Sequence, residues 1–219
     1  MIGTSLVMNR SGMFFPLRDD NPTKIVPFVN WSIIAVCILV FVVSLLNFEE
    51  TISTWGFTPA SFSLVTLFTS MFLHAGIAHI AGNLWFLYIF GDNIEERLGH
   101  VAYLAFYIAA GIGAGLLHAL VEMGSSIPAV GASGAISGVL GAYLVFYPTA
   151  KVHVTGQGGV GKVPASVMLL AWFGLQFAQG VLGLFGASSG VAFWAHIGGF
   201  IVGAGVAFVV RGRPTASNN

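Results

Sequence analysis

Two polar residues in apolar, glycine-rich surroundings carry the strongest chemical signal in this chain, Ser133 and His196. Ser133 belongs to a Gly-Ala-Ser-Gly string at 131–134, where an apolar stretch begins that ends near Tyr147. His196 lies in a later apolar segment with regularly spaced glycines. Serine and histidine together are the smallest set of side chains that makes a hydroxyl nucleophilic. The pair therefore indicates covalent catalysis by a serine.

His79 and Asn83 stand four residues apart at the start of another apolar stretch, which places them one turn apart on one face of a helix. An imidazole N–H and a side-chain amide are suitable donors to a tetrahedral oxyanion, together with the backbone N–H of Ser133. Each such donor is worth about 3–4 kcal/mol of transition-state stabilisation. We therefore expect Asn83, His79 and Ser133 to form an oxyanion site.

Less specific interpretations apply to each of these residues taken singly. A glycine-flanked serine in a membrane helix is usually a packing residue, and a lone histidine more often bridges helices or lines a water pocket. Polar residues inside a membrane are nevertheless functional candidates by default. Other chemistries fit worse: Ile80 follows His79, so a zinc-protease HExxH motif is absent, and Asp92 is the only aspartate near an apolar stretch. We expect no metal, no cofactor and no nucleic-acid partner.

The composition predicts an integral membrane protein. Hydrophobic residues make up 56% of the chain and charged residues only 7%, with a mean hydropathy of +0.88, whereas about 25% of an ordinary soluble domain is charged. The apolar stretches are 25–46, 77–91, 101–121, 133–147, 164–185 and 193–210. We predict an all-α polytopic membrane protein with a bundle of six transmembrane helices at 25–210, a leader at 1–24 and a tail at 211–219.

The basic residues predict the orientation of these spans. With six spans, all of them fall on one side of the membrane, which the positive-inside rule makes cytoplasmic. They are Arg10, Arg18, Lys24, Arg97, Lys151, Lys162, Arg211 and Arg213. The opposite side carries Glu49, Glu50 and Glu122. Both termini should therefore be cytoplasmic, and the polar leader should not be cleaved as a signal peptide.

The stretch that begins at Ser133 is too short to cross the membrane alone. As a helix it is ~22 Å long, against a hydrocarbon thickness of ~30 Å. If it ends at the cytoplasmic surface, Ser133 lies ~8–10 Å below the outer surface, at the floor of a cavity. The preceding residues 124–130 must then descend to it, and nonhelical backbone is tolerated at that depth only where it lines protein or water.

Glycines predict how the two key residues meet. Gly134, Gly138 and Gly141 follow Ser133, while Gly199 and Gly203 follow His196, and this small-xxx-small spacing lets helix backbones approach closely. Gly131 should let the descending segment turn, and Gly134 should let the helix of His196 approach.

Two connections between the apolar stretches also have a distinctive composition. Residues 57–73 are predicted to lie at the outer interface, and the glycines between 156 and 161 predict a flexible cytoplasmic loop.

The motifs, taken together and in order, resemble those of the rhomboid family of intramembrane serine proteases. They are His79 with Asn83 (HxxxN), Glu95 with Arg97 and Gly99 (ExR and its glycine), Gly131–Gly134 (GxSG), and Ala195-His196 with Gly199 and Gly203 (AHxxGxxxG). The Pro-Leu-Arg-Asp-Asp leader at 16–20 is similar to that of many bacterial members. The resemblance covers nearly the whole chain.

The resemblance implies a dyad in which Ser133 is the nucleophile and His196 the general base. It implies the same oxyanion residues and a six-helix core, with Glu95 and Arg97 tying the cytoplasmic end of the second span to its connection. The expected activity is cleavage of transmembrane segments of other proteins within the bilayer, and the expected location is a bacterial plasma (inner) membrane. Supporting positions would be Gly131, Gly134, Gly199 and Gly203.

Two departures from the family pattern affect the expected site. Val65-Thr66 replaces a Trp-Arg pair that anchors the first loop in many members. Ser137 replaces a tyrosine that packs on the catalytic histidine in some members, so aromatic support has to come from elsewhere or is missing. No carboxylate is evident to orient His196. Substrate entry past the fifth span, with Trp172, Phe173 and Phe177, and entry over the first loop both stay open.

Two other functions fit the same composition. A rhomboid-like protein can bind transmembrane clients without cutting them, although such relatives usually lack the serine or the histidine. A small channel or transporter can line its path with polar residues, but few intramembrane charges and no internal repeat are visible here. Labelling of Ser133 by a fluorophosphonate separates the protease from the binder.

Overall fold

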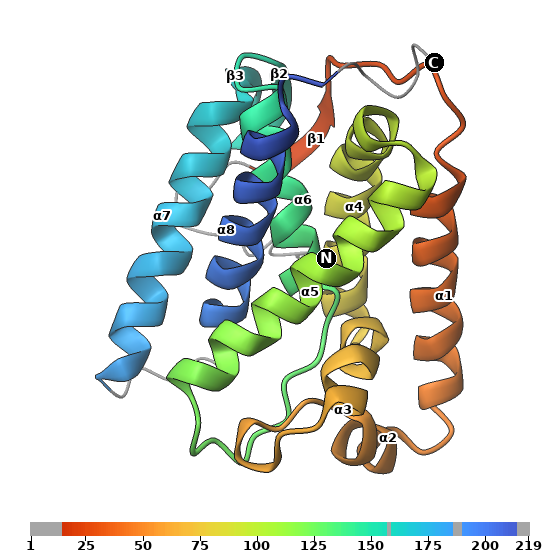
Figure 1. Cartoon of the computed structure of the whole chain (residues 1–219), viewed down its shortest axis with the longest axis vertical. Helices are drawn as coiled ribbons and strands as arrows, with labels where there is room; N and C mark the ends of the chain where they lie inside the picture. The colour runs from red at the N-terminus through yellow and green to blue at the C-terminus, as the bar shows by residue number, and fades with distance from the viewer. Residues whose placement is uncertain (1–14, 157–158, 186–189, 214–219) are drawn as a thin grey trace, which may run out of the picture.

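The computed structural model describes residues 15–156, 159–185 and 190–213. The chain is mainly helical, with a small antiparallel sheet at one end of the helical bundle (Figure 1). The elements are β1 (Phe15–Asp19), α1 (Phe28–Ser44), α2 (Phe48–Trp55), the 3-10 helix η1 (Pro59–Ser61), α3 (Leu64–Thr69), the 3-10 helix η2 (Ser70–Phe72), α4 (Ile77–Leu98), α5 (His100–Val121), α6 (Ser133–Phe146), β2 (Lys151–Gly156), β3 (Gly159–Pro164), α7 (Ala165–Leu184) and α8 (Phe193–Val210).

Helix α6 forms the centre of the bundle. All its residues from Gly134 to Tyr143 are buried, and it contacts α4, α5, α7 and α8. Its glycine-rich, uncharged sequence makes this possible, because small residues let several helix backbones approach one another. A helix enclosed on every side in this way holds its first residue, Ser133, inside the protein.

The helices differ in whether they are long enough to cross a membrane. Within the described ranges, α5, α7 and α8 are long and apolar enough to do so, while α1 and α6 are apolar but shorter. The segment 64–72 and α4 would form a fourth span if taken as one, although they are bent by 86° relative to each other. Many large apolar side chains on the outside of α1, α7 and α8 are exposed, such as Leu39, Leu170 and Val209. An exposed apolar belt of this kind belongs in lipid.

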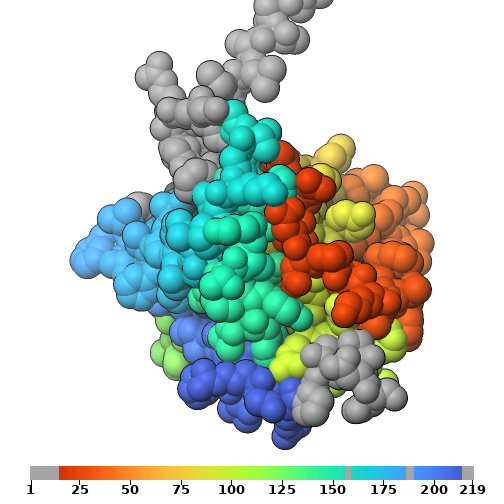
Figure 2. All heavy atoms as spheres, turned by 90° about the horizontal axis from the view of Figure 1, so that it is seen from above, coloured from red at the N-terminus to blue at the C-terminus, as the bar shows by residue number. Residues whose placement is uncertain are grey.

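The prediction of a flexible loop between the fourth and fifth apolar stretches is wrong for its described residues. They form β2 and β3, which pair antiparallel, and β1 from the leader adds to β2. The alternation of Val152 and Val154, both buried, with polar residues gives this hairpin its strand pattern. The chain is therefore not purely α-helical. The sheet lies on one end of the bundle, as seen from above in Figure 2.

Charged groups join the leader to this hairpin. The Asp20 carboxylate lies 2.7 Å from Lys162 Nζ and 2.7 Å from His153 Nε2. These two hydrogen bonds, that of Lys162 foremost, lower the pKa of Asp20 below its ordinary value. The described lysines and arginines all lie at this end of the molecule, on the sheet, in the last turn of α4, or beside the ends of α1 and α8.

Glu95 and Arg97, near the end of α4, each interact with the terminus of another helix. The buried Glu95 carboxylate accepts the backbone N–H groups of Val29 and Asn30, at 3.0 and 2.7 Å, in the first turn of α1. Arg97 donates to the carbonyls of Arg211 and Arg213, both at 2.8 Å, after α8. An anion at a helix N-terminus and a cation at a C-terminus both complement the helix dipole. The two residues therefore hold α1 and α8 to α4, which is more than the predicted link to the next connection.

Replacing Glu95 by glutamine is expected to lower the free energy of unfolding by about 1–3 kcal/mol, because one of the two α1 N–H groups loses its acceptor in a buried position. Denaturant titration in detergent micelles measures this loss. Glu96→Gln is the control, since that carboxylate accepts the Lys24 N–H at an exposed position. Equal stability of the two variants would contradict the assigned role of Glu95.

Candidate active site

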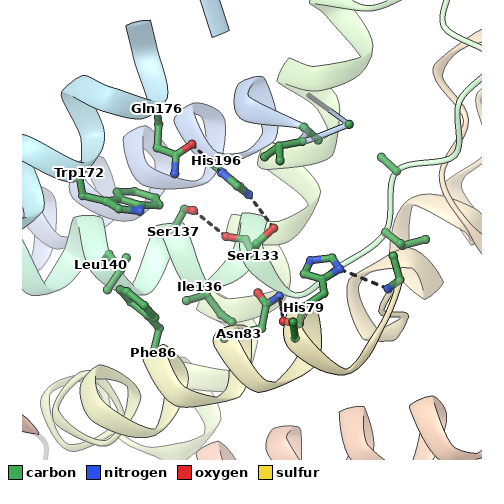
Figure 3. A pocket seen from close by; sticks show the side chains of 18 of the residues that line it. His79, Asn83, Phe86, Ser133, Ile136, Ser137, Leu140, Trp172, Gln176 and His196 are labelled. Carbon is green, nitrogen blue, oxygen red and sulfur yellow. Dashed lines mark hydrogen bonds between the residues drawn. The ribbon is translucent and has the colours of Figure 1, made fainter. Parts of the chain in front are cut away.

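Ser133 and His196 lie side by side in the wall of a cavity. The Oγ atom of Ser133 is 2.8 Å from Nε2 of His196, and both residues line a cavity of about 620 Å³. Figure 3 shows the imidazole of α8 pointing at the hydroxyl at the start of α6. The cavity is also lined by His79 and Asn83 from α4 and by Trp172 and Gln176 from α7. The structure thus brings together all four polar residues that the sequence singled out.

Direct backbone packing of α6 on α8 produces this proximity. A Cβ atom added at Gly199 would collide with the carbonyl oxygen of Gly134, and one at Gly203 would collide with that of Gly138. The glycine-to-glycine packing expected between these helices is therefore present. The role expected of Gly134 is different: the nearest atom to a Cβ there is the Ala114 methyl of α5, at 2.6 Å, and Ala195 of α8 is more distant. Gly134 makes room for α5.

The segment that descends to Ser133 is held by the first loop. Phe57 and Ala129 exchange two backbone hydrogen bonds, at 3.0 and 2.8 Å, and the Gly131 N–H donates to the Ser70 carbonyl at 2.9 Å. Gly131 has a φ of +129°, a conformation that only glycine adopts without strain. Phe57 is also buried. These contacts hold the first loop in place, although it has Val65-Thr66 where many family members have the anchoring Trp-Arg pair.

His79 presents a donor to the site. The Ala75 N–H donates to Nδ1 of His79 at 3.3 Å, so in the neutral ring the proton resides on Nε2. That Nε2 lies beside Gly131, where an added Cβ would come within 2.8 Å of it. Asn83 donates one amide hydrogen to the His79 carbonyl at 2.9 Å, and its amide carries a second hydrogen. An α-helix also leaves the N–H groups of its first turn without intrahelical acceptors, and Ser133 begins α6.

Aromatic support for His196 comes from Trp172 on α7 and from Phe193 at the start of α8. The Trp172 ring lies 6.0 Å from the imidazole, at an interplanar angle of 30°. Phe193 approaches the imidazole edge-on at 6.4 Å. Ser137 donates its hydroxyl to the Ser133 carbonyl, one turn earlier in the same helix, at 2.6 Å. Trp172 therefore supplies the aromatic contact that Ser137 cannot make.

Gln176 is a site residue that the sequence did not reveal. Its Oε1 lies 3.2 Å from Nδ1 of His196. A single glutamine in an apolar helix has no motif around it, although an uncharged polar residue in a membrane span is itself a signal. Within the described ranges, no group of three or more His, Cys, Asp or Glu side chains is arranged to hold a metal ion.

Similarity to known proteins places this site in a family. The family model described as "Rhomboid domain" matches residues 61–213. The chain belongs to the rhomboid family. This rhomboid is 28% identical to the protein named rhomboid protease GlpG from Salmonella choleraesuis over 194 residues, which cover 83% of this chain and 62% of the relative. All the residues of the site fall within the matched domain.

Two plant relatives show similar identity. RHOMBOID-like protein 6, mitochondrial, from Arabidopsis thaliana is 32% identical over 148 residues, 68% of this chain and 44% of the relative. Rhomboid-like protein 11, chloroplastic, from the same plant is 30% identical over 171 residues, 73% of this chain and 56% of the relative. The chain thus spans less than two thirds of the length of these relatives.

Proposed function

We propose that this rhomboid is an intramembrane serine endopeptidase that cleaves transmembrane segments of other membrane proteins. The observation that carries the proposal is the 2.8 Å contact between Ser133 Oγ and His196 Nε2, two residues that line the same cavity. This distance lies within the hydrogen-bond reach that a nucleophile and its base require. The name of the Salmonella relative, a rhomboid protease, supports the same activity.

In the proposed mechanism, neutral His196 accepts the Ser133 proton at Nε2 while Oγ attacks a peptide carbonyl. The resulting oxyanion is stabilised by His79 Nε2–H, the Asn83 amide and the Ser133 backbone N–H. Protonated His196 then gives its proton to the leaving amine, which leaves an acyl-enzyme on Ser133. A water molecule, deprotonated by the same imidazole, hydrolyses the ester and restores the serine.

The proposed setting is a plasma membrane crossed by six spans, with the sheet end of the bundle in the cytoplasm. Because the described basic residues gather at that end, the positive-inside rule supports this orientation. With 14 residues, α6 is about 21 Å long, shorter than the hydrocarbon is thick. Ser133 then lies below the outer surface, in a cavity of about 620 Å³ that has room for water molecules and for an unwound segment of substrate.

Labelling with a fluorophosphonate probe tests the proposal and separates a protease from a non-proteolytic binder of transmembrane clients. The probe should modify the detergent-solubilised protein at Ser133, located by mass spectrometry of the peptides. His196→Ala should slow labelling at least about 100-fold, because the hydroxyl loses its base. His153→Ala, on the sheet, is the control and should label at the wild-type rate. An unlabelled Ser133 in folded protein would remove the basis for the protease assignment.

A further inference from the structure

Both ring nitrogens of His196 have partners on different helices. Nε2 faces Ser133 Oγ on α6 at 2.8 Å, and Nδ1 faces Gln176 Oε1 on α7 at 3.2 Å. Figure 3 shows the three side chains in line, with the amide oxygen of Gln176 directed at the imidazole. The line of contacts has the order glutamine, histidine, serine.

An amide oxygen accepts hydrogen bonds and cannot donate them. The contact with Gln176 therefore places the imidazole proton on Nδ1 and leaves the lone pair on Nε2. Only this tautomer accepts the Ser133 proton; the other would direct an N–H at the hydroxyl. When Nε2 takes up that proton, the amide dipole also faces a cation, and a hydrogen bond to a charged group is stronger than one between neutral groups.

We propose that Gln176 is a positioning residue that fixes the tautomer and the ring orientation of His196. The proposal rests on the proposed protease function and adds a third member to the Ser133–His196 pair. Gln176 does not touch the reacting atoms and acts only through the imidazole. Its side chain is partly buried and lines the same cavity as the other two residues.

The position of Gln176 makes the alignment of His196 depend on α7. This helix lies at the edge of the bundle (Figures 1 and 2), and its buried residues are only Ala165, Met168, Leu169 and Gly180. Near the site, α7 is held by ring contacts, including Phe173 on Phe200 at 4.5 Å. A displacement of α7 from α8 would withdraw Oε1 and release Nδ1. His196 therefore keeps the tautomer that can act as a base only while α7 stays packed against α8.

The test uses the full-length protein in liposomes with a transmembrane peptide substrate. Gln176→Met keeps the length of the side chain and removes the acceptor. It should lower kcat roughly 10- to 100-fold, the equivalent of one hydrogen bond to a charged group, while KM stays within about two-fold. Gln176→Glu restores an acceptor at Nδ1 and should recover most of kcat. It should also move the acid limb of the kcat profile to higher pH, because a carboxylate favours the protonated imidazole.

The control is Gln179→Met, one turn further along α7 and outside the residues that line the cavity. It should leave kcat, KM and the pH profile unchanged. An unchanged kcat in Gln176→Met would overturn the role of Gln176, as would an equal loss of kcat in the control. So would a Gln176→Glu variant that folds but neither recovers kcat nor shifts its pH profile.

A second readout needs no proteolysis. Nitrogen-15 shifts of the histidine ring, assigned with His196→Ala, report the tautomer directly. The wild type should show protonated Nδ1, and Gln176→Met should show a mixture of tautomers. A mixture in the wild type would overturn the positioning role even if the enzyme is active. If the wild type cleaves no substrate, the protease proposal fails, while the tautomer still decides whether Gln176 positions the ring.

Discussion

Replacing Ser133 by alanine is expected to abolish cleavage of a transmembrane substrate, lowering kcat at least about 1000-fold. The variant removes Oγ, the atom that lies 2.8 Å from His196 Nε2. The oxyanion donors and the cavity remain, so substrate binding should persist. The measurement is product formation from a labelled transmembrane peptide in liposomes, followed for long enough to detect residual activity.

Ser32→Ala serves as the matched control. That hydroxyl lies on α1 and donates to its own helix, to the Phe28 carbonyl at 2.7 Å. Its removal should leave kcat at the wild-type value. The melting temperatures of both variants should stay near that of the wild type, because neither removes buried apolar volume. Cleavage by the folded Ser133→Ala variant would show that another group is the nucleophile.

Replacing Gly203 by alanine is expected to cause a large loss of stability. The new methyl group would collide with the carbonyl oxygen of Gly138 and come within 2.6 Å of its Cα, so rigid backbone would have to move. Overpacking a core commonly costs about 1–3 kcal/mol, and more where backbone opposes it. Moving α8 away from α6 would also separate His196 from Ser133. The free energy of unfolding, measured by denaturant titration, and the rate of fluorophosphonate labelling should therefore both decrease.

Gly205→Ala on the same helix provides the control. Nothing lies within 4 Å of a Cβ at Gly205, and alanine favours a helix over glycine by up to about 1 kcal/mol. Its stability should equal or slightly exceed that of the wild type, with unchanged labelling. If Gly203→Ala were as stable as Gly205→Ala, the close packing of α6 on α8 would be refuted.

Much of the architecture follows from local sequence properties. The apolar stretches predicted the helices because a membrane favours long runs of uncharged residues in which every backbone group is paired within the helix. The beginning of α6 at Ser133 was also predictable. The β2–β3 hairpin was missed, because its glycines suggested a loop and the strand that completes the sheet, β1, comes from the distant leader.

The types and order of the site residues could be predicted from the sequence for a similar reason. Polar side chains are costly inside a membrane, so those found there are candidates for function. This is why the sequence singles out Ser133, His196, His79 and Asn83. The spacing of Gly199 and Gly203 likewise predicted the close approach of α8 to α6, because glycines one turn apart present a continuous flat surface.

Tertiary contacts decided how these groups are oriented. Nothing near Gln176 in the chain predicts that its amide reaches His196 from a neighbouring helix. The same holds for the aromatic contact of Trp172, the approach of Gly134 to Ala114 of α5, and the Glu95 and Arg97 links to α1 and α8. A pattern along one helix reports which face is apolar or small. Which atom of another helix meets that face depends on the packing of the whole bundle, and so does the tautomer of the base.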